Sequence, residues 1–294
     1  MKPIEDRIAD LPVWTSPIGI EPLKGGLSNE SHTVTSGGEK FVVRLGSDYP
    51  FHHVSREREL MTARAAHAAG FAPEVVYAEP GLMVSRFING QTYGEAEVRG
   101  NIGEIARLMR RFHIAMPAHV SGPGFIFWVF HVIRDYGHTL VAGNSRMAGE
   151  VPGYVELAAK LEEVQQPLPI VFGHHDLLPA NFIHDGRRLW LIDFEYAGFG
   201  TAMFDLAGIA SNAGFDSAQA DELLAVYFDA APSATLRQSH AAMQCASLLR
   251  EAMWSMVSEL HLNAPGVDYE GYTAENLTRL EASLEAYQTA YGKV

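Results

Sequence analysis

The pattern of apolar residues changes near residue 90, and this change limits the folds open to the chain. Before it, strand-like segments alternate with glycines, and the segments 31–35 and 40–45 flank Gly37-Gly38, as in a β-hairpin. After it, apolar residues recur with the 3.6-residue spacing of an amphipathic helix, first over 102–112. We therefore expect an α+β fold with a small β-rich N-terminal part and a larger, mainly helical C-terminal part.

One helix is expected in the N-terminal part, over 55–69. Its alanines favour a helix, Ser55 can cap the first amide groups, and Gly70 can end it. Two more strands, 74–77 and 82–88, are expected to follow. The N-terminal part then has strands on both sides of a single helix.

The C-terminal part combines helices with one β segment. The segment 170–194 contains Asp185-Gly186 between two short apolar runs, which is a strong hairpin signal. Residues 89–92 are interpreted as a linker, so we expect two lobes, residues 1–88 and 89–294, with a ligand cleft between them. Further helices are expected at 153–165, 217–230, 236–262 and 273–291.

Composition excludes several classes of function. The 294 residues include 22 Lys and Arg against 35 Asp and Glu, a formal net charge of −13. A chain this acidic is a poor partner for nucleic acid or an anionic membrane, whereas a cationic small molecule would meet a favourable field. Cys245 is the single cysteine, which excludes an internal disulfide. The N-terminus lacks the apolar stretch of a signal peptide, and no apolar run reaches ~20 residues, so we expect a cytoplasmic protein.

Three oxygen-bearing side chains surround the predicted hairpin. Asp176 precedes Asn181, and Asp193 follows the second apolar run. Phosphoryl transfer from ATP needs a carboxylate to orient and deprotonate the acceptor hydroxyl, and oxygen ligands to hold Mg²⁺ on the phosphates. Asp176 suits the first task. Asn181 and Asp193 suit the second, because the hairpin returns Asp193 beside Asn181. Each residue alone could as well be an ordinary turn or strand-end residue, and the joint pattern favours phosphoryl transfer.

The same segment carries a family resemblance. His174-x-Asp176 with Leu177-Leu-Pro-Ala-Asn181 resembles the catalytic loop of kinases. With Ile192-Asp-Phe-Glu-Tyr-Ala-Gly198, it more specifically resembles the aminoglycoside phosphotransferase and choline kinase superfamily, and within it bacterial choline/ethanolamine kinase-like proteins. In this superfamily Asp-Phe-Glu or Asp-Trp-Glu stands where protein kinases have Asp-Phe-Gly.

The resemblance implies a protein-kinase-like fold of two lobes, with ATP and Mg²⁺ as cofactors. The implied reaction is transfer of the γ-phosphate to the hydroxyl of a small, amine-bearing alcohol. An aminoglycoside, or another small metabolite such as thiamine, is the alternative acceptor.

The resemblance also extends to the ATP clamp. The family has a Gly-Gly-x-Ser/Thr-Asn element, and this chain has Gly25, Gly26, Ser28 and Asn29 in a similar run. These residues are therefore candidates for the phosphate side of the nucleotide, since glycines let backbone amides approach phosphates. Taken alone, the glycine pair is more often only a turn.

The strand 40–45 offers a second part of the clamp. Alternation puts Val42 and Arg44 on one face, where a small apolar residue would cover the adenine and a cation would bind the α- and β-phosphates. The family has a similar Arg-x-x-Glu in the next helix, so Glu59 is expected to pair with Arg44. An exposed arginine on an edge strand and an exposed carboxylate at a helix start are the alternatives.

Other positions are assigned supporting roles by the resemblance. His174 is expected to support the catalytic loop through hydrogen bonds, and Asp205 is expected to brace that loop from a helix. His175 occupies a variable position, and we expect it to be solvated or to lie behind the reacting groups.

The acceptor side is expected on the late helix. Trp254 matches one tryptophan of the aromatic cage that surrounds the ammonium group in choline and ethanolamine kinases. Glu251 stands where eukaryotic choline kinases have a second tryptophan, and its carboxylate could neutralise a cationic head group. Tyr269 and Tyr272 are weaker aromatic candidates. Ordinary core packing is the alternative for Trp254.

Two other classes of protein remain possible on the sequence. A metal-dependent hydrolase could use a cluster of histidines and carboxylates (His174, His175, Asp176, His184 and Asp193). This hypothesis leaves Arg44, Glu59 and the spacing of Asp176 and Asn181 unexplained. A binding-only pseudokinase is the other class, although every expected catalytic position is filled.

Overall fold

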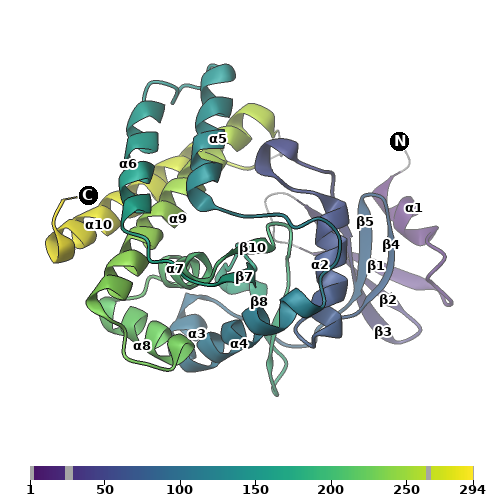
Figure 1. The fold of residues 1–294 in the computed structure, drawn as a ribbon. Coiled ribbons are helices and arrows are strands. Elements are labelled where there is room, and N and C mark those ends of the chain that lie inside the picture. Colours follow the sequence, from purple (N-terminus) through teal and green to yellow (C-terminus); the bar gives the residue numbers. More distant parts are fainter. Residues whose placement is uncertain (1–2, 24–28, 263–265, 294) are drawn as a thin grey trace.

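The N-terminal part of the computed structural model is a five-stranded antiparallel sheet in the order β1-β2-β3-β5-β4 (Figure 1). The structure describes residues 3–23, 29–262 and 266–293. The elements of this part are α1 (Ile4–Ala9), β1 (Ile18–Leu23), β2 (Glu30–Ser36), β3 (Glu39–Leu45), the short 3₁₀ helix η1 (Pro50–His52), α2 (Arg56–Ala68), β4 (Val75–Glu79) and β5 (Leu82–Arg86). The expected hairpin, helix and two later strands are confirmed, with bounds that differ by one or two residues.

The sheet and α2 face different cores. Strand β3 buries Phe41 and Val43 on one side, where they pack with Ile8 of α1. Helix α2 begins after Ser55, whose side chain accepts a hydrogen bond from the Arg58 N–H, and its alanines join the larger core of the C-terminal helices. In Figure 1, α2 accordingly lies between the sheet and the rest of the chain.

The C-terminal part is mainly helical. The four predicted helices correspond to α6, α8, α9 and α10, and the helix expected to begin at residue 102 is α4. The helices are α3 (Glu95–Gly100), α4 (Ile102–Ala115), η2 (Met116–Ala118), α5 (Val129–Ala142), α6 (Val151–Glu163), η3 (Pro179–Asn181), α7 (Ala202–Asn212), α8 (Ser217–Phe228), α9 (Ala234–His261) and α10 (Tyr269–Tyr291).

Two long helices, α5 and α7, were not identified from the apolar spacing, and a helix at α7 was implied only by the role that the resemblance gives Asp205. Helix α5 starts with aromatic and β-branched residues, which favour strands, so local propensity opposes the helix that packing against α9 produces. Helix α7 is buried around its whole circumference from Ala202 to Ala210. It therefore has no polar face from which a 3.6-residue period could be recognised.

Short strands in the C-terminal part hold the chain segments that flank the predicted hairpin. These are β6 (Gln91–Thr92), β7 (Ile170–Gly173), β8 (Phe182–His184), β9 (Leu189–Leu191) and β10 (Gly198–Thr201). The hairpin of β8 and β9 is confirmed. Two residues of the segment 89–92, interpreted as a linker, form β6, which pairs with β8 and adds a third strand to the hairpin. The division into lobes at residue 88 remains a prediction.

No helix in the part of the chain that the structure describes is long and apolar enough to cross a membrane.

Substitution of Phe112 in α4 tests the packing of the large core. Its fully buried ring contacts Phe71 after α2 edge-on, with centroids 5.3 Å apart, and stacks on Phe194 at 6.1 Å. We expect Phe112→Ala to lower the free energy of unfolding by about 3–5 kcal/mol in urea denaturation. Ile114→Ala, on the exposed face of the same helix, should change it by less than about 0.5 kcal/mol. Equal effects of the two substitutions would contradict the packing described here.

Candidate active site

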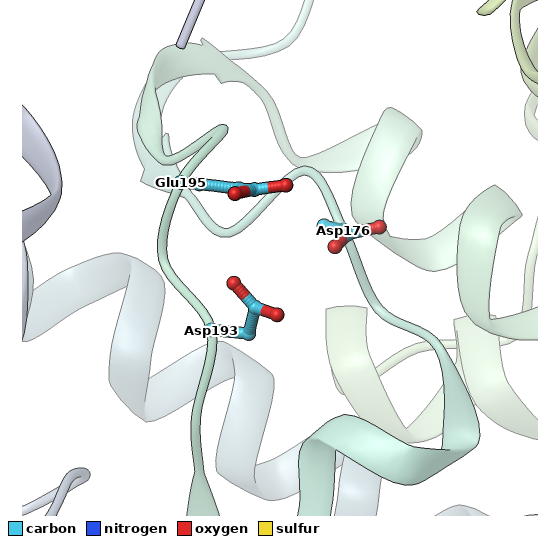
Figure 2. A group of neighbouring side chains, drawn as sticks. All are labelled: Asp176, Asp193 and Glu195. Carbon is cyan, nitrogen blue, oxygen red and sulfur yellow. The ribbon is translucent and has the colours of Figure 1, made fainter. Parts of the chain in front are cut away.

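Three carboxylates converge between the loop after β7 and the segment after β9. Asp176 comes from the loop, and Asp193 and Glu195 come from the segment, with one oxygen of each within 4.8 Å of the others. Figure 2 shows the three side chains directed into the same space from two stretches of chain. Glu195 was not among the sequence candidates, although it is the glutamate of the Asp-Phe-Glu run on which the resemblance rests.

Hydrogen bonds hold the two stretches in register. The Ile192 N–H donates to the backbone oxygen of Asn181 over 3.2 Å, so the hairpin places Asp193 beside Asn181. Nδ2 of Asn181 donates to the backbone oxygen of Asp176 over 2.7 Å. This bond fixes the orientation of the amide and leaves Oδ1 as the side-chain atom that can accept a bond or bind a metal ion.

Asp205 of α7 binds the loop from behind. Its two carboxylate oxygens accept hydrogen bonds from the backbone N–H groups of His174 and His175, over 2.8 and 2.7 Å. Nε2 of His113 donates to the same carboxylate over 2.8 Å. Burial alone would raise the pKa of Asp205, but the bond from His113 and the neighbouring histidines lower it well below its usual range.

His174 links the loop to the other stretch. Its Nε2 donates to the backbone oxygen of Ile192 over 2.9 Å, one residue before Asp193. The imidazole is completely buried, which lowers its pKa. The hydrogen-bonded position expected for His174 is therefore present.

The expectation that His175 could be solvated is wrong. Its ring is buried, stacks on Phe127 with centroids 4.5 Å apart, and has a pKa lowered by burial to about 4. A Cβ added at Gly173 would lie 2.3 Å from its Nε2, so only glycine leaves room for the ring. The backbone φ angles of His175 (64°) and Asp193 (70°) lie in a region that few residues other than glycine adopt. Such backbone conformations cluster at functional sites.

Arg44 of β3 reaches this group from the N-terminal sheet. Its guanidinium forms ion pairs with Glu59 (2.8 Å), Asp193 (2.7 Å) and Glu195 (3.1 Å). The expected pair with Glu59 is thus present, and the two pairs to the C-terminal segment are additional. Burial would lower the pKa of Arg44, but the charges of Asp193, Glu59 and Glu195 outweigh it and raise the pKa above its usual value.

Arg56, at the start of α2, is a second cation that sequence reasoning missed. Its Nη1 donates to Glu59 over 2.6 Å and to Glu195 over 3.0 Å. The run Arg56-Glu-Arg-Glu59 that opens the helix could have indicated this cation, but only Glu59 was assigned a role from it.

Carboxylates outnumber cations in this cluster. Three of them (Glu59, Asp193 and Glu195) pair with the guanidinium groups of Arg44 and Arg56, and Asp176 lies beside Asp193 and Glu195. Burial first, and then the charge of Asp193, raise the pKa of Asp176 well above its usual value. An excess of carboxylate oxygens on half-buried and buried residues is a donor set that fits a hard divalent cation such as Mg²⁺.

Among the residues that the structure describes, the group suited to a metal contains carboxylates alone. The histidines proposed for a hydrolase centre (His174, His175 and His184) are not part of it. His174 and His175 instead bond to the backbone oxygens of Ile192 and Tyr196. This arrangement does not support the hydrolase alternative.

The remaining clamp candidates are placed only in part. Val42 is half-buried in β3, on the face that also carries Arg44. Nδ2 of Asn29 donates to Glu195 over 3.1 Å, which brings Asn29 to the carboxylate cluster. Gly25, Gly26 and Ser28 lie outside the described residues.

The acceptor candidates on α9 are closely packed. Trp254 is buried, stacks on His52 with centroids 5.1 Å apart, and donates through Nε1 to the Tyr196 hydroxyl over 2.8 Å. Glu251 accepts hydrogen bonds from Arg250 (2.7 Å) and from the Tyr272 hydroxyl (2.8 Å). Its charge is therefore offset by a neighbour that the sequence analysis did not consider.

Comparison with known proteins identifies a family. The model of the phosphotransferase enzyme family (APH) matches residues 19–242. Protein LicA of Haemophilus influenzae is 26% identical over 211 residues, which cover 69% of this chain and 61% of LicA. A probable ethanolamine kinase of Arabidopsis thaliana is 27% identical over 217 residues, which cover 67% of this chain and 57% of the relative. The match thus spans about three fifths of each of these relatives.

Solved structures match nearly the whole chain. A choline/ethanolamine kinase family protein from Mesorhizobium loti has a TM-score of 0.78 and 26% identity, covering 98% of this chain and 97% of its own. Choline kinase LicA from Streptococcus pneumoniae has a TM-score of 0.76 and 20% identity, covering 97% and 98%. The α+β fold expected from the sequence is confirmed, and it matches that of protein-kinase-like neighbours.

The bonds to Asp205 generate a prediction for stability. Because its pKa is lowered in the folded protein, its ionised form stabilises the fold above the pKa of the unfolded chain, about 3.9, and this contribution is lost as the pH falls. We expect Asp205→Asn to lower the free energy of unfolding by about 3 kcal/mol or more at pH 7. The deficit relative to the native protein should narrow below about pH 4.

Chemical denaturation at several pH values measures this deficit. Asp221→Asn is the matched control, because its partner Arg237 is on the surface, and it should cost less than about 1 kcal/mol. A deficit for Asp205→Asn that is small or independent of pH would contradict the role assigned to the carboxylate.

Proposed function

The chain belongs to the phosphotransferase enzyme family, and from that premise we propose that it transfers the γ-phosphoryl group of ATP to the hydroxyl group of a small alcohol. The observation that carries this proposal is the convergence of Asp176 with Asp193 and Glu195 next to Arg44. A relative named probable ethanolamine kinase and a solved structure of a choline/ethanolamine kinase family protein support an amine-bearing alcohol as the acceptor. The acidic composition of the chain favours such a cation.

In the proposed reaction, Asp176 accepts a hydrogen bond from the acceptor hydroxyl and takes its proton. The hydroxyl oxygen forms a bond to the γ-phosphorus, the bond from that phosphorus to the bridging β-phosphate oxygen breaks, and ADP leaves. The raised pKa of Asp176 suits a group that must accept a proton. Asp205 acts through the backbone of His174 and His175 and keeps the loop before Asp176 in place.

Arg44 and Glu59 would position the nucleotide. The guanidinium already spans the sheet and the segment of Asp193, so the phosphates would bind where residues 1–88 and 89–294 meet. Val42 would lie against the adenine, and Gly25, Gly26, Ser28 and Asn29 would lie on the phosphate side.

The carboxylate cluster would hold Mg²⁺ through Asp193 and Asn181, with Glu195 beside them. When bound there, the ion would neutralise charge on the β- and γ-phosphates. Asn181 is fixed for this role by its bond to the loop, and Asp193 by the hairpin.

The pocket beside Asp176 is narrow. It is a cavity of about 10 Å³, lined in part by Asp176, Asn212, Ser247 and Glu251. An aminoglycoside would therefore require the site to open further than a small alcohol would. The hygromycin B complex of an aminoglycoside phosphotransferase resembles this chain at a TM-score of 0.71 but at 18% identity, which supports the fold alone.

Replacement of Asp176 tests the reaction. We expect Asp176→Asn to lower kcat for ethanolamine phosphorylation by about 10²- to 10⁴-fold, because the proton acceptor is lost, with little change in ATP affinity. Product can be followed by phosphorus NMR. Asp229→Asn removes an exposed carboxylate at a position with φ of 56°, which asparagine tolerates, and should leave kcat unchanged. Normal turnover by Asp176→Asn would overturn the assignment.

A further inference from the structure

The pocket beside Asp176 contains a buried cation that no part of the proposed reaction uses. Arg250 of α9 lines this pocket together with Asp176 and Glu251, yet it is only 4% exposed. Its guanidinium lies over the ring of Tyr196 at 4.5 Å and within 5.8 Å of the ring centroid of Phe127. A permanent positive charge therefore faces the place where the acceptor of the proposed reaction would bind.

The hydrogen bonds of Arg250 are incomplete. Nη1 donates to Glu251 over 2.7 Å, but within the described part of the chain Nε and Nη2 have no hydrogen-bond partner. A buried donor without a partner costs about 1–3 kcal/mol, and more when it belongs to a charged group. Such a group in a binding pocket indicates a ligand that completes the bonds.

The two unpartnered nitrogens define the shape of that ligand. The N–H groups of Nε and Nη2 lie on the same edge of the planar guanidinium and point in parallel, which is the fork that binds both oxygens of one carboxylate. A phosphate could use the same fork, but its second negative charge would face Asp176 and Glu251. The pocket therefore fits a carboxylate better.

Glu251 adds a site for a positive group. Its oxygens accept one hydrogen bond each from Arg250 and the Tyr272 hydroxyl, and an ionised carboxylate can accept more than two. An ammonium group can therefore bind Glu251 while the charge of Arg250 stays available to an anion. Eukaryotic choline kinases have a tryptophan at the position of Glu251. This chain instead has a carboxylate there, paired with Arg250.

We propose that the acceptor is a zwitterionic amino alcohol, whose carboxylate binds Nε and Nη2 of Arg250 while its ammonium group lies against Glu251 and its hydroxyl faces Asp176. This inference rests on the proposed function and narrows its acceptor to hydroxy amino acids and related betaines. Arg250 is then a binding residue that determines specificity.

Two matched pairs of acceptors test the inference on the full chain. Serine differs from ethanolamine only by a carboxylate, and carnitine differs from choline mainly by a carboxylate arm. We expect the member with the carboxylate to have the higher kcat/KM, by about 10- to 100-fold, the factor that corresponds to a charged hydrogen bond. The rate of ATP-dependent product formation gives kcat/KM for each of the four acceptors.

A variant separates binding from folding. Arg250→Lys keeps the charge beside Glu251 but removes the fork, so the ratio of kcat/KM for serine over ethanolamine should fall by about 10-fold or more. The ratio is used because general damage to the fold lowers both values together. Arg237→Lys, at a surface arginine of the same helix, should leave the ratio as in the native protein.

The outcomes distinguish the two proposals. Phosphorylation of ethanolamine and choline with no gain from the carboxylate, or an unchanged ratio in Arg250→Lys, would overturn the role of Arg250 and leave the proposed function intact. Absence of product from all four acceptors would contradict both.

Discussion

The site depends on one ion-paired cluster that joins the sheet to the helical part of the chain. Arg44 comes from a strand of the N-terminal sheet, Glu59 from α2, and Asp193 and Glu195 from the segment after the hairpin. Removal of one partner of a buried pair costs about 3–5 kcal/mol, because the other charge is left without compensation. The cluster thereby fixes the position of the sheet relative to the carboxylates, and in the proposed reaction relative to the acceptor.

Asp205 fixes the other side of the same site. It binds two consecutive backbone N–H groups of the loop and the side chain of His113, all from a helix that is buried on every face. The carboxylate of Asp176, which takes the proton in the proposed reaction, is thus carried by a short loop whose preceding residues are hydrogen-bonded to the core. Rigid support of this kind is what positions groups to within the small tolerances that catalysis requires.

Much of this arrangement could be predicted, and the exceptions share a cause. The Asp185-Gly186 turn predicts the hairpin, and alternation in β3 predicts the face of Arg44, because both signals are local. Helix α7 has no polar face, His175 owes its burial to the absence of a side chain at Gly173, and β6 is a strand only because β8 lies next to it. The ion pair of Glu251 with Arg250 could not be predicted either, because the helical sequence does not show that the Arg250 side chain is buried beside Glu251. Tertiary packing determines each of these features, and contacts between distant segments cannot be read from a single sequence.

We propose that the cluster around Arg44 binds a magnesium nucleotide. The most direct measurement is a crystal structure of the chain with Mg²⁺ and a non-hydrolysable ATP analogue. We expect a metal ion about 2.0–2.1 Å from oxygens of Asp193 and Asn181. We also expect Arg44 to contact both Glu59 and the phosphates, and the Asp176 carboxylate to face the γ-phosphate. A nucleotide bound away from these residues, or Asp176 and Asp193 turned apart in its presence, would contradict the proposed site.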